Sequence, residues 1–219
     1  MKTKLQIAAM ALLSNFFLQA QQATKGIIGT TNWMNNWTNF KPAANEYNEA
    51  TNIIAGNIDK DMKLLKRNTY QLVGVVYVTN NATLTIEPGT VIRGDDKTCG
   101  TLVITKGAKI MAEGLETDPI VFTSNKEKTE RKPGDWGGII VLGKAPINTL
   151  GGLHTLPFDL EPMLNHYGGQ DAEDNSGILK YVRIEYAGRK LSSLKELNGL
   201  SLAGVGRKTV LSIFRWSRS

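Results

Sequence analysis

The fold is decided by two short stretches, TLTIEPGTVI at residues 83–92 and TLVITKGAKI at residues 101–110. Each alternates apolar and polar side chains, turns at a glycine and continues as a second apolar run. Thr, Leu, Ile, Gly and the final Ile occupy the same places in both stretches. Such a repeat of strand, turn and strand predicts a solenoid, because one coil buries its apolar face only against the next coil.

The spacing of the repeat, eighteen residues, also predicts which side chains stack. Equivalent residues of the two stretches would lie on neighbouring coils, in parallel strands about 4.8 Å apart. The predicted pairs are Leu84 with Leu102, Ile86 with Ile104, and Ile92 with Ile110.

Looser copies of this pattern continue to residue 206. In one of them, GILKYVRIEYAG at 177–188, we expect Val182 and Ile184 to face inward and Arg183 and Glu185 to face solvent. Polar segments separate the strands, and we expect them to leave one corner of the solenoid as loops, where such proteins usually carry binding surfaces. These segments are 124–134, 149–176 and 189–196.

The two ends of the chain differ from this body. Lys2 and Lys4 precede a short apolar stretch, and Ala20 ends a small-residue cleavage site, a pattern typical of a signal peptide. The apolar stretch is too short to predict a membrane span, and no later segment is apolar enough. The expected organisation is a signal peptide at 1–20, an irregular N-terminal lead-in and cap at 21–69, a parallel β-helix at 70–206 and a basic tail at 207–219.

The formal net charge of +6 does not indicate a nucleic-acid-binding protein. The excess of basic residues lies in the signal peptide and in the tail, whereas a nucleic-acid-binding domain needs a basic face on its folded body. Cys99 is the single cysteine, so an intrachain disulfide is excluded. Stability must therefore come from packing, ions or assembly.

Four runs carry a resemblance to a known family: VYVTNNATLTIEPGTVIRG, GDWGGIIVLGKAPIN, DNSGILKYVRIEYAG and LNGLSLAGVG. The chain resembles secreted and cell-surface right-handed parallel β-helix proteins of Bacteroidetes, which are pectin-lyase-like in fold. The resemblance implies an all-β solenoid exported to the cell surface, and relatives often carry a C-terminal sorting domain for type IX secretion. The end of the chain, LSIFRWSRS, departs from the family pattern, so we expect a truncated or frame-shifted C-terminus.

An acidic loop, QDAEDNSG, is the one candidate for a cation site. Asp171, Glu173, Asp174 and Asn175 offer oxygen ligands of the kind that Ca²⁺ prefers. The spacing does not fit an EF-hand loop, and a solvated loop that leads into a strand is the alternative. We assign no catalytic, cofactor-binding or metal-binding residue.

Other reactive side chains do not form a motif. Asp159 and Glu161 could supply the two carboxylates of a glycoside hydrolase, but they lie in a loop between prolines. His154 and His166 lack partners at metal-ligand spacing, so a structural or surface role is expected.

Two further patterns suggest binding. Trp33, Trp37, Phe40 and Tyr47 could form a platform that stacks on sugars, or they could pack the lead-in onto the body. The tripeptide RGD at 93–95 could indicate adhesion, although acidic residues at a turn are ordinary turn chemistry.

The sequence therefore predicts an exported, non-catalytic β-helix protein of the cell surface, structural or binding, with a polysaccharide or cell-surface glycan as its partner. The alternative is a polysaccharide lyase or glycoside hydrolase of the same fold whose site is incomplete here.

Overall fold

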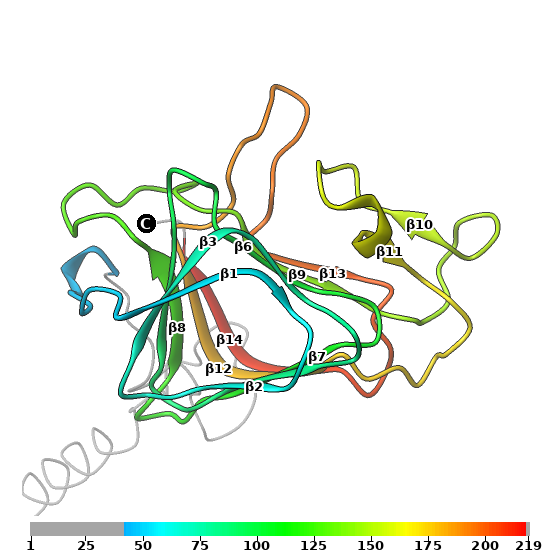
Figure 1. The fold of residues 1–219 in the computed structure, drawn as a ribbon, viewed down its shortest axis with the longest axis horizontal. Helices are drawn as coiled ribbons and strands as arrows, with labels where there is room; N and C mark the ends of the chain where they lie inside the picture. Colours follow the sequence, from blue (N-terminus) through cyan, green and yellow to red (C-terminus); the bar gives the residue numbers. More distant parts are fainter. Residues whose placement is uncertain (1–41, 218–219) are drawn as a thin grey trace, which may run out of the picture. The chain divides into compact units, whose positions relative to one another are not determined.

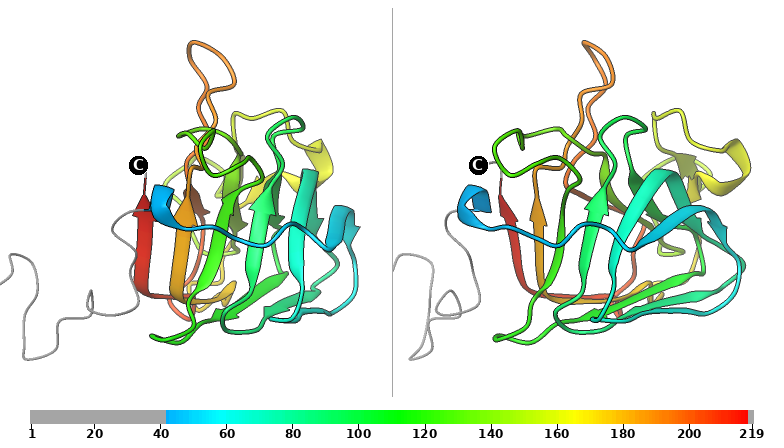
Figure 2. Two further views of the ribbon diagram at one scale, coloured as in Figure 1. Left: turned by 90° about the vertical axis from the view of Figure 1, so that its left-hand side faces the viewer. Right: turned by 60° about the vertical axis from the view of Figure 1, so that its left-hand side comes forward.

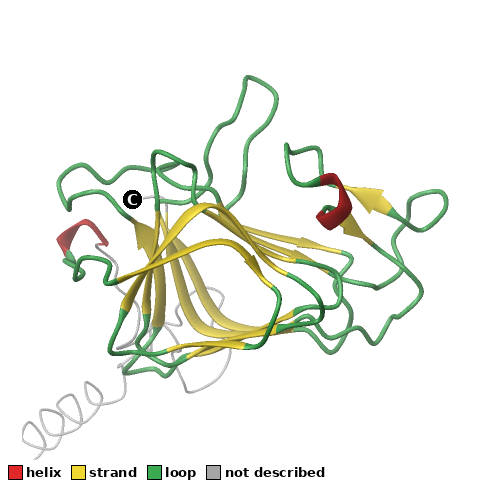
Figure 3. Ribbon diagram, in the orientation of Figure 1, coloured by secondary structure: helices red, strands yellow, loops and turns green. Residues whose placement is uncertain are grey.

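The computed structural model describes residues 42–217, and nearly all of their regular structure is β-strand (Figures 1 and 3). Two short 3₁₀ helices, η1 (Pro42–Ala44) and η2 (Pro162–Leu164), are the exceptions within these residues. The strands are β1 (Asn52–Ile58), β2 (Met62–Leu64), β3 (Thr69–Val78), β4 (Thr83–Ile86), β5 (Val91–Gly94), β6 (Thr101–Ile104), β7 (Lys109–Glu113), β8 (Ile120–Ser124), β9 (Gly138–Leu142), β10 (His154–Thr155), β11 (His166–Tyr167), β12 (Gly177–Glu185), β13 (Leu200–Ala203) and β14 (Val210–Ser217).

Twelve strands form one continuous parallel sheet, which winds into a right-handed parallel β-helix, as the sequence predicted (Figure 1). Each coil contributes to three faces. Face A consists of β5, β8, the first halves of β1 and β3 and the second halves of β12 and β14. Face B consists of β6, β9, β13 and the second halves of β1 and β3. Face C consists of β2, β4, β7 and the first halves of β12 and β14.

The predicted stacking of the two repeats is wrong. Leu84 pairs with Ile110 on face C, whereas Leu102 pairs with Val76 on face B. Ile92 pairs with Phe122 on face A. The reason is that a coil holds three strands and spans 26 residues from Leu84 to its partner Ile110 (110 − 84). A shift of eighteen residues therefore falls short of one coil and leads from face C to face B. The repeated stretches share a strand-and-turn pattern but not a face.

Apolar side chains from all three faces fill the interior of the coils. Inward residues of successive coils stack along each face, and each buried Leu or Ile contributes roughly 1.5–3 kcal/mol relative to exposure. The stacked and buried residues include Tyr70, Ile92, Phe122 and Ile184 on face A, Val76, Leu102 and Ile139 on face B, and Ile86, Ala112 and Leu179 on face C.

Single left-handed residues turn the chain from face to face. Gly74 bends β3 between faces A and B with a φ of 66°. Tyr181 does the same in β12, between faces C and A, with a φ of 49°. This bend interrupts the alternation, so Leu179 and Val182 both face inward and both are buried.

The predicted inward positions of Val182 and Ile184 are confirmed, since both are fully buried. The prediction that Arg183 and Glu185 face solvent is wrong. They do lie on the outer side of face A, but only 9% of Arg183 and 1% of Glu185 is exposed, because the segment before β1 covers them.

That segment, residues 42–51, is called the strap here. It crosses the strands of face A in a single pass (Figure 2). Thr51 at its end donates its backbone N–H to the carbonyl of Thr69, where the chain enters β1. Strands β1 and β2 lie inside the segment expected as lead-in and cap, and β14 lies inside the expected basic tail. The solenoid therefore begins and ends further out along the chain than expected.

The insertions leave two corners of the coils, not the single corner expected. Residues 95–100, 125–135 and 186–199 lie at the corner between faces A and B, and we call them the corner loops. Residues 143–176, which carry β10, η2 and β11, leave the corner between faces B and C and pack on the outer side of face B (Figures 1 and 2). There Leu156, Phe158, Leu160, Leu164 and Tyr167 lie against Tyr77, Val103, Ile140 and Leu142.

Candidate functional site

The corner loops are held together by buried and half-buried charges. Asp135 accepts hydrogen bonds from the Nζ of Lys126 at 2.9 Å and from the hydroxyl of Ser124 at 2.6 Å. Lys126 also lies 3.6 Å from Asp96 of the neighbouring corner loop. The hydrogen bond that Lys126 donates to Asp135 raises the pKa of Lys126, and Coulombic attraction to Asp135 and Asp96 adds to the shift. Arg189 of the third loop donates to the backbone carbonyl of Asp96.

A hollow of about 350 Å³ lies between two of these loops, and we call it the corner pocket. Its walls include Arg189, Lys190 and Glu196, so two cations and one carboxylate meet there. Lys190 and Glu196 face one another across an isolated antiparallel bridge. The other residues of the wall have small side chains, so a ligand could reach their backbone. They are Pro133, Gly134, Ala187 and Gly188.

A second polar cluster lies beneath the strap on face A. It consists of Arg93, Thr123, Arg183 and Glu185, and we call it the charged row. The neighbouring strands β5, β8 and β12 supply these residues, and all four are at most 9% exposed. A buried charge costs folding free energy unless it is paired and hydrogen-bonded, so the partners of each group matter.

Glu185 is the single carboxylate of the charged row. It accepts hydrogen bonds from the hydroxyl of Thr123 at 3.1 Å and from the hydroxyl of Tyr47 in the strap, and the Nε of Arg183 lies 4.0 Å away. Burial raises the pKa of Glu185 above its usual value, although Arg183 and the two hydroxyls oppose the shift. Burial and the charge of Glu185 also raise the pKa of the Tyr47 phenol.

Two arginines join the strap to the loops. Arg93 donates to the backbone carbonyls of Asn48 in the strap and of Asn125 at the edge of a corner loop. Arg131 donates to the carbonyl of Asn45 at 3.0 Å and lies over the ring of Tyr47 at 5.4 Å. Among the described residues, the buried Nε atoms of Arg93 and Arg183 have no hydrogen-bond partner.

The acidic loop does not fit a Ca²⁺ site. The side chain of Asp171 accepts the backbone N–H of Glu173, and that of Asn175 accepts the N–H of Gly177. Asp174 is buried and bonded to the hydroxyl of Ser176, while Glu173 pairs with Arg207. These oxygens fix the turn into β12 and do not converge. Within residues 42–217, no three His, Cys, Asp or Glu side chains are grouped so as to hold a metal ion.

The structure does not bring the other candidates into a site. His154 and His166 lie on the paired strands β10 and β11, exposed, and the ring of His154 lies 5.9 Å from that of Tyr167. Asp159 is 93% exposed and lies 3.6 Å from Lys195. Glu161 is exposed as well.

The RGD tripeptide is not displayed as an adhesion motif would be. Arg93 is held beneath the strap, and Asp95 is 8% exposed and bonded to Thr98 and Gln71. Of the aromatic residues considered for sugar stacking, Trp33, Trp37 and Phe40 lie outside the described residues, and Tyr47 is bonded to Glu185.

A protein-family model described as a pectate-lyase like beta helix domain matches residues 56–218. The chain belongs to this family. Searches of curated proteins and of solved structures found no match. Among the residues that the structure describes, no helix is long and apolar enough to cross a bilayer.

Sequence reasoning missed both polar clusters of this pectate-lyase-like β-helix. The alternation in β12 correctly places Arg183 and Glu185 outside, but no local signal announces that a distant segment covers them. Arg189, Lys190 and Glu196 do lie at the edges of a predicted loop. Their approach to the loop at 125–135 depends on how many residues each coil inserts, which the repeat does not reveal.

Proposed function

We propose that this chain is an exported, non-catalytic cell-surface protein that binds an acidic polysaccharide at the corner pocket. The corner pocket carries the proposal, because two cations, one carboxylate and accessible backbone meet in one hollow on a stiff support. A volume of about 350 Å³ lies at the lower end of the usual range for ligand pockets, roughly 300–1,000 Å³. Export is supported by the signal-peptide pattern at 1–20. The cell-surface location is supported by the resemblance of the four runs to cell-surface β-helix proteins.

The composition of the pocket favours binding over hydrolysis. Glycoside hydrolysis requires two carboxylates that flank the scissile bond, and the corner pocket contains one, Glu196. The candidates Asp159 and Glu161 are exposed and are not among its wall residues. A polysaccharide lyase or hydrolase of the same fold is the second candidate function, and membership of the pectate-lyase-like family is the observation that favours it.

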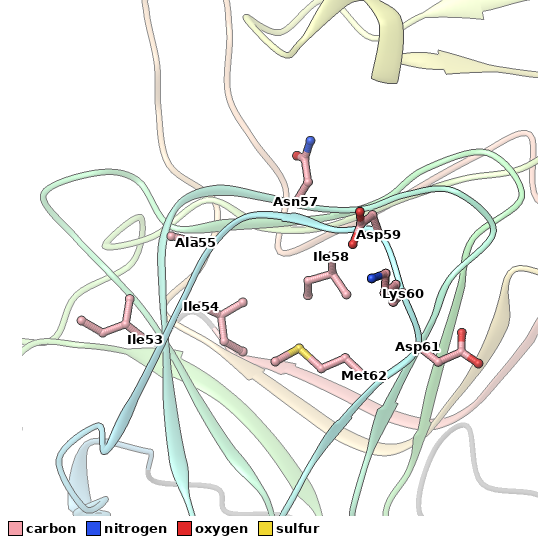
Figure 4. Close-up of a pocket in the computed structure, with 9 residues that line it drawn as sticks. All are labelled: Ile53, Ile54, Ala55, Asn57, Ile58, Asp59, Lys60, Asp61 and Met62. Atoms are coloured by element: carbon pink, nitrogen blue, oxygen red, sulfur yellow. The ribbon is translucent and has the colours of Figure 1, made fainter.

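Affinity electrophoresis tests the proposal, with the purified full chain run through gels that contain polygalacturonate, alginate or a neutral glucan. The wild type should be retarded by an acidic polymer, and Lys190→Ala should lose most of this retardation. Lys60→Ala is the matched control, since it removes one exposed lysine at a different corner. Lys60 lies beside a separate hollow next to β1 and β2, where Asp59 and Asp61 flank it (Figure 4). Release of unsaturated or reducing ends from any polymer would instead show an enzyme. If the chain shows neither retardation by a polymer nor release of ends from it, the chain acts as a structural scaffold.

A further inference from the structure

The strap covers a surface that is unusual for its polarity. A segment that crosses a sheet normally covers apolar side chains, because their burial is what stabilises the contact. Here the buried residues on the outer side are Arg93, Thr123, Arg183 and Glu185, with one apolar neighbour, Val121, and β-strands hold them in place. Withdrawing such groups from water is unfavourable unless new bonds replace those to water. The Nε atoms of Arg93 and Arg183 have none.

The strap itself is held at few points. At its end, Thr51 bonds to Thr69 at the start of β3. Before that point, the strap offers three groups to the described part of the body: the carbonyls of Asn45 and Asn48 and the hydroxyl of Tyr47. It forms no strand, and most of its side chains are exposed or half-buried. A segment with so little buried apolar area opens at low free-energy cost compared with the strands beneath it.

The groups that the strap presents are of the types found in a saccharide. Arg93 and Arg131 bind oxygen acceptors, and Glu185 binds a hydroxyl donor. A sugar hydroxyl is both donor and acceptor, and an aligned row of guanidinium and carboxylate groups can bind several of them along an extended chain. The ring of Tyr47 lies beneath the guanidinium of Arg131, and a ligand could take the place of this ring.

We propose that the charged row is a second saccharide-binding surface and that the strap is its intramolecular occupant, which must leave before a glycan binds there. The ligand class rests on the proposed function, but the location does not, since the charged row and the corner pocket share no residue. The strap thus limits binding on face A, and loss of its Tyr47 anchor increases it.

The test removes the Tyr47 anchor in a variant whose corner pocket no longer binds the polysaccharide. Tyr47→Ala is combined with Lys190→Ala, and retardation in an acidic-polysaccharide gel is compared with that of Lys190→Ala alone. If the covered site is open in roughly 10% of molecules or fewer, releasing the strap raises the apparent affinity roughly tenfold or more. Glu46→Ala is the matched control, because this neighbouring strap residue is exposed and should leave retardation unchanged.

Hydrogen exchange of strap amides reports whether the strap has been released. Faster exchange in Tyr47→Ala without any gain in retardation would overturn the proposal and leave the strap as a structural cover. If Tyr47→Ala does not fold, Tyr47→Phe removes the hydroxyl alone and should give a smaller gain in retardation; no gain would again overturn it. Should Lys190→Ala lose binding while the Tyr47 variants gain nothing, the corner pocket stands and the second surface falls. If instead Lys190→Ala keeps its retardation and the Tyr47 variants gain retardation, the second surface is supported and the corner pocket is not.

Discussion

The hydroxyl of Tyr47 lies 3.1 Å from each carboxylate oxygen of Glu185, although 138 residues separate the two along the chain. This contact joins the strap to the second half of β12. It is also the point where the strap meets the only carboxylate of the charged row, so it governs both the stability of face A and its response to pH.

The stability of the protein should depend on the protonation of Glu185. Burial raises its pKa in the folded protein above the usual value of 4.5, so the folded chain holds this proton to higher pH than the unfolded chain. The contribution of Glu185 to the free energy of unfolding is therefore most favourable below about pH 4.5 and falls as pH rises through the folded pKa. Glu185→Gln should flatten this decline when the free energy of unfolding is measured by denaturant titration over a series of pH values.

The comparison is made between variant and wild type at each pH, because other carboxylates act in the opposite direction. The hydrogen bond from Lys63 lowers the pKa of Glu87, for example, and its effect cancels in the difference. A decline that is equally steep in Glu185→Gln would show that Glu185 titrates as it does in the unfolded chain.

Loss of the Tyr47 hydroxyl should cost about 1–2 kcal/mol, since the bond is partly buried and its acceptor can be charged. Tyr47→Phe is the variant, measured alone and together with Glu185→Gln in a double-mutant cycle. The two changes should not be additive. Additive effects would mean that the hydroxyl and the carboxylate do not stabilise one another.

The register of the coils can be tested with engineered cysteines in a Cys99→Ser background. Thr85 and Met111 are direct neighbours on face C, and paired strands lie about 4.8 Å apart, within the range of Cα separations that a disulfide spans. Thr85→Cys with Met111→Cys should therefore cross-link on oxidation, as seen by mass spectrometry. Thr85→Cys with Val103→Cys, which follows the eighteen-residue spacing, should not.

Two glycines with positive φ should respond differently to alanine. Gly74→Ala places its Cβ in open space, so the cost is the strain of the left-handed backbone, about 1–2 kcal/mol. At Gly177, where φ is 116°, the new Cβ would overlap the carbonyl oxygen of Ile110 on the neighbouring coil. Thermal unfolding should show a much larger loss for Gly177→Ala, and equal losses would contradict the close approach of β12 to β7.

The fold class could be predicted from the sequence because the repeat itself shows the pattern of strand, turn and strand. Leu84 and Ile86 alternate with threonines, and Gly89 follows, which is sufficient to predict a coil that stacks. It was not sufficient to predict the partner of Leu84, since that depends on how many residues pass before the chain returns to the same face. The corner loops vary in length from coil to coil, so a single spacing does not describe the stack.

The candidate sites were harder to predict for a related reason. Glu185 and Tyr47 meet through the path of a segment that has no periodicity of its own, and nothing in either local sequence indicates the other. Arg189 and Lys190 lie in the segment 189–196 that was predicted to be a loop, but a loop residue becomes part of a pocket only when the neighbouring loop is placed beside it.

The path of the strap has a consequence for the order in which the protein is made. With 138 residues between Tyr47 and Glu185 and synthesis at about 5–20 residues per second, the ribosome releases the tyrosine on the order of 10 s before its partner exists. During this interval the strap lacks Glu185 and has only Arg93 and Arg131, which are made earlier, as partners on the body. Because the outer side of face A is hydrophilic, it does not associate with other nascent chains during this interval.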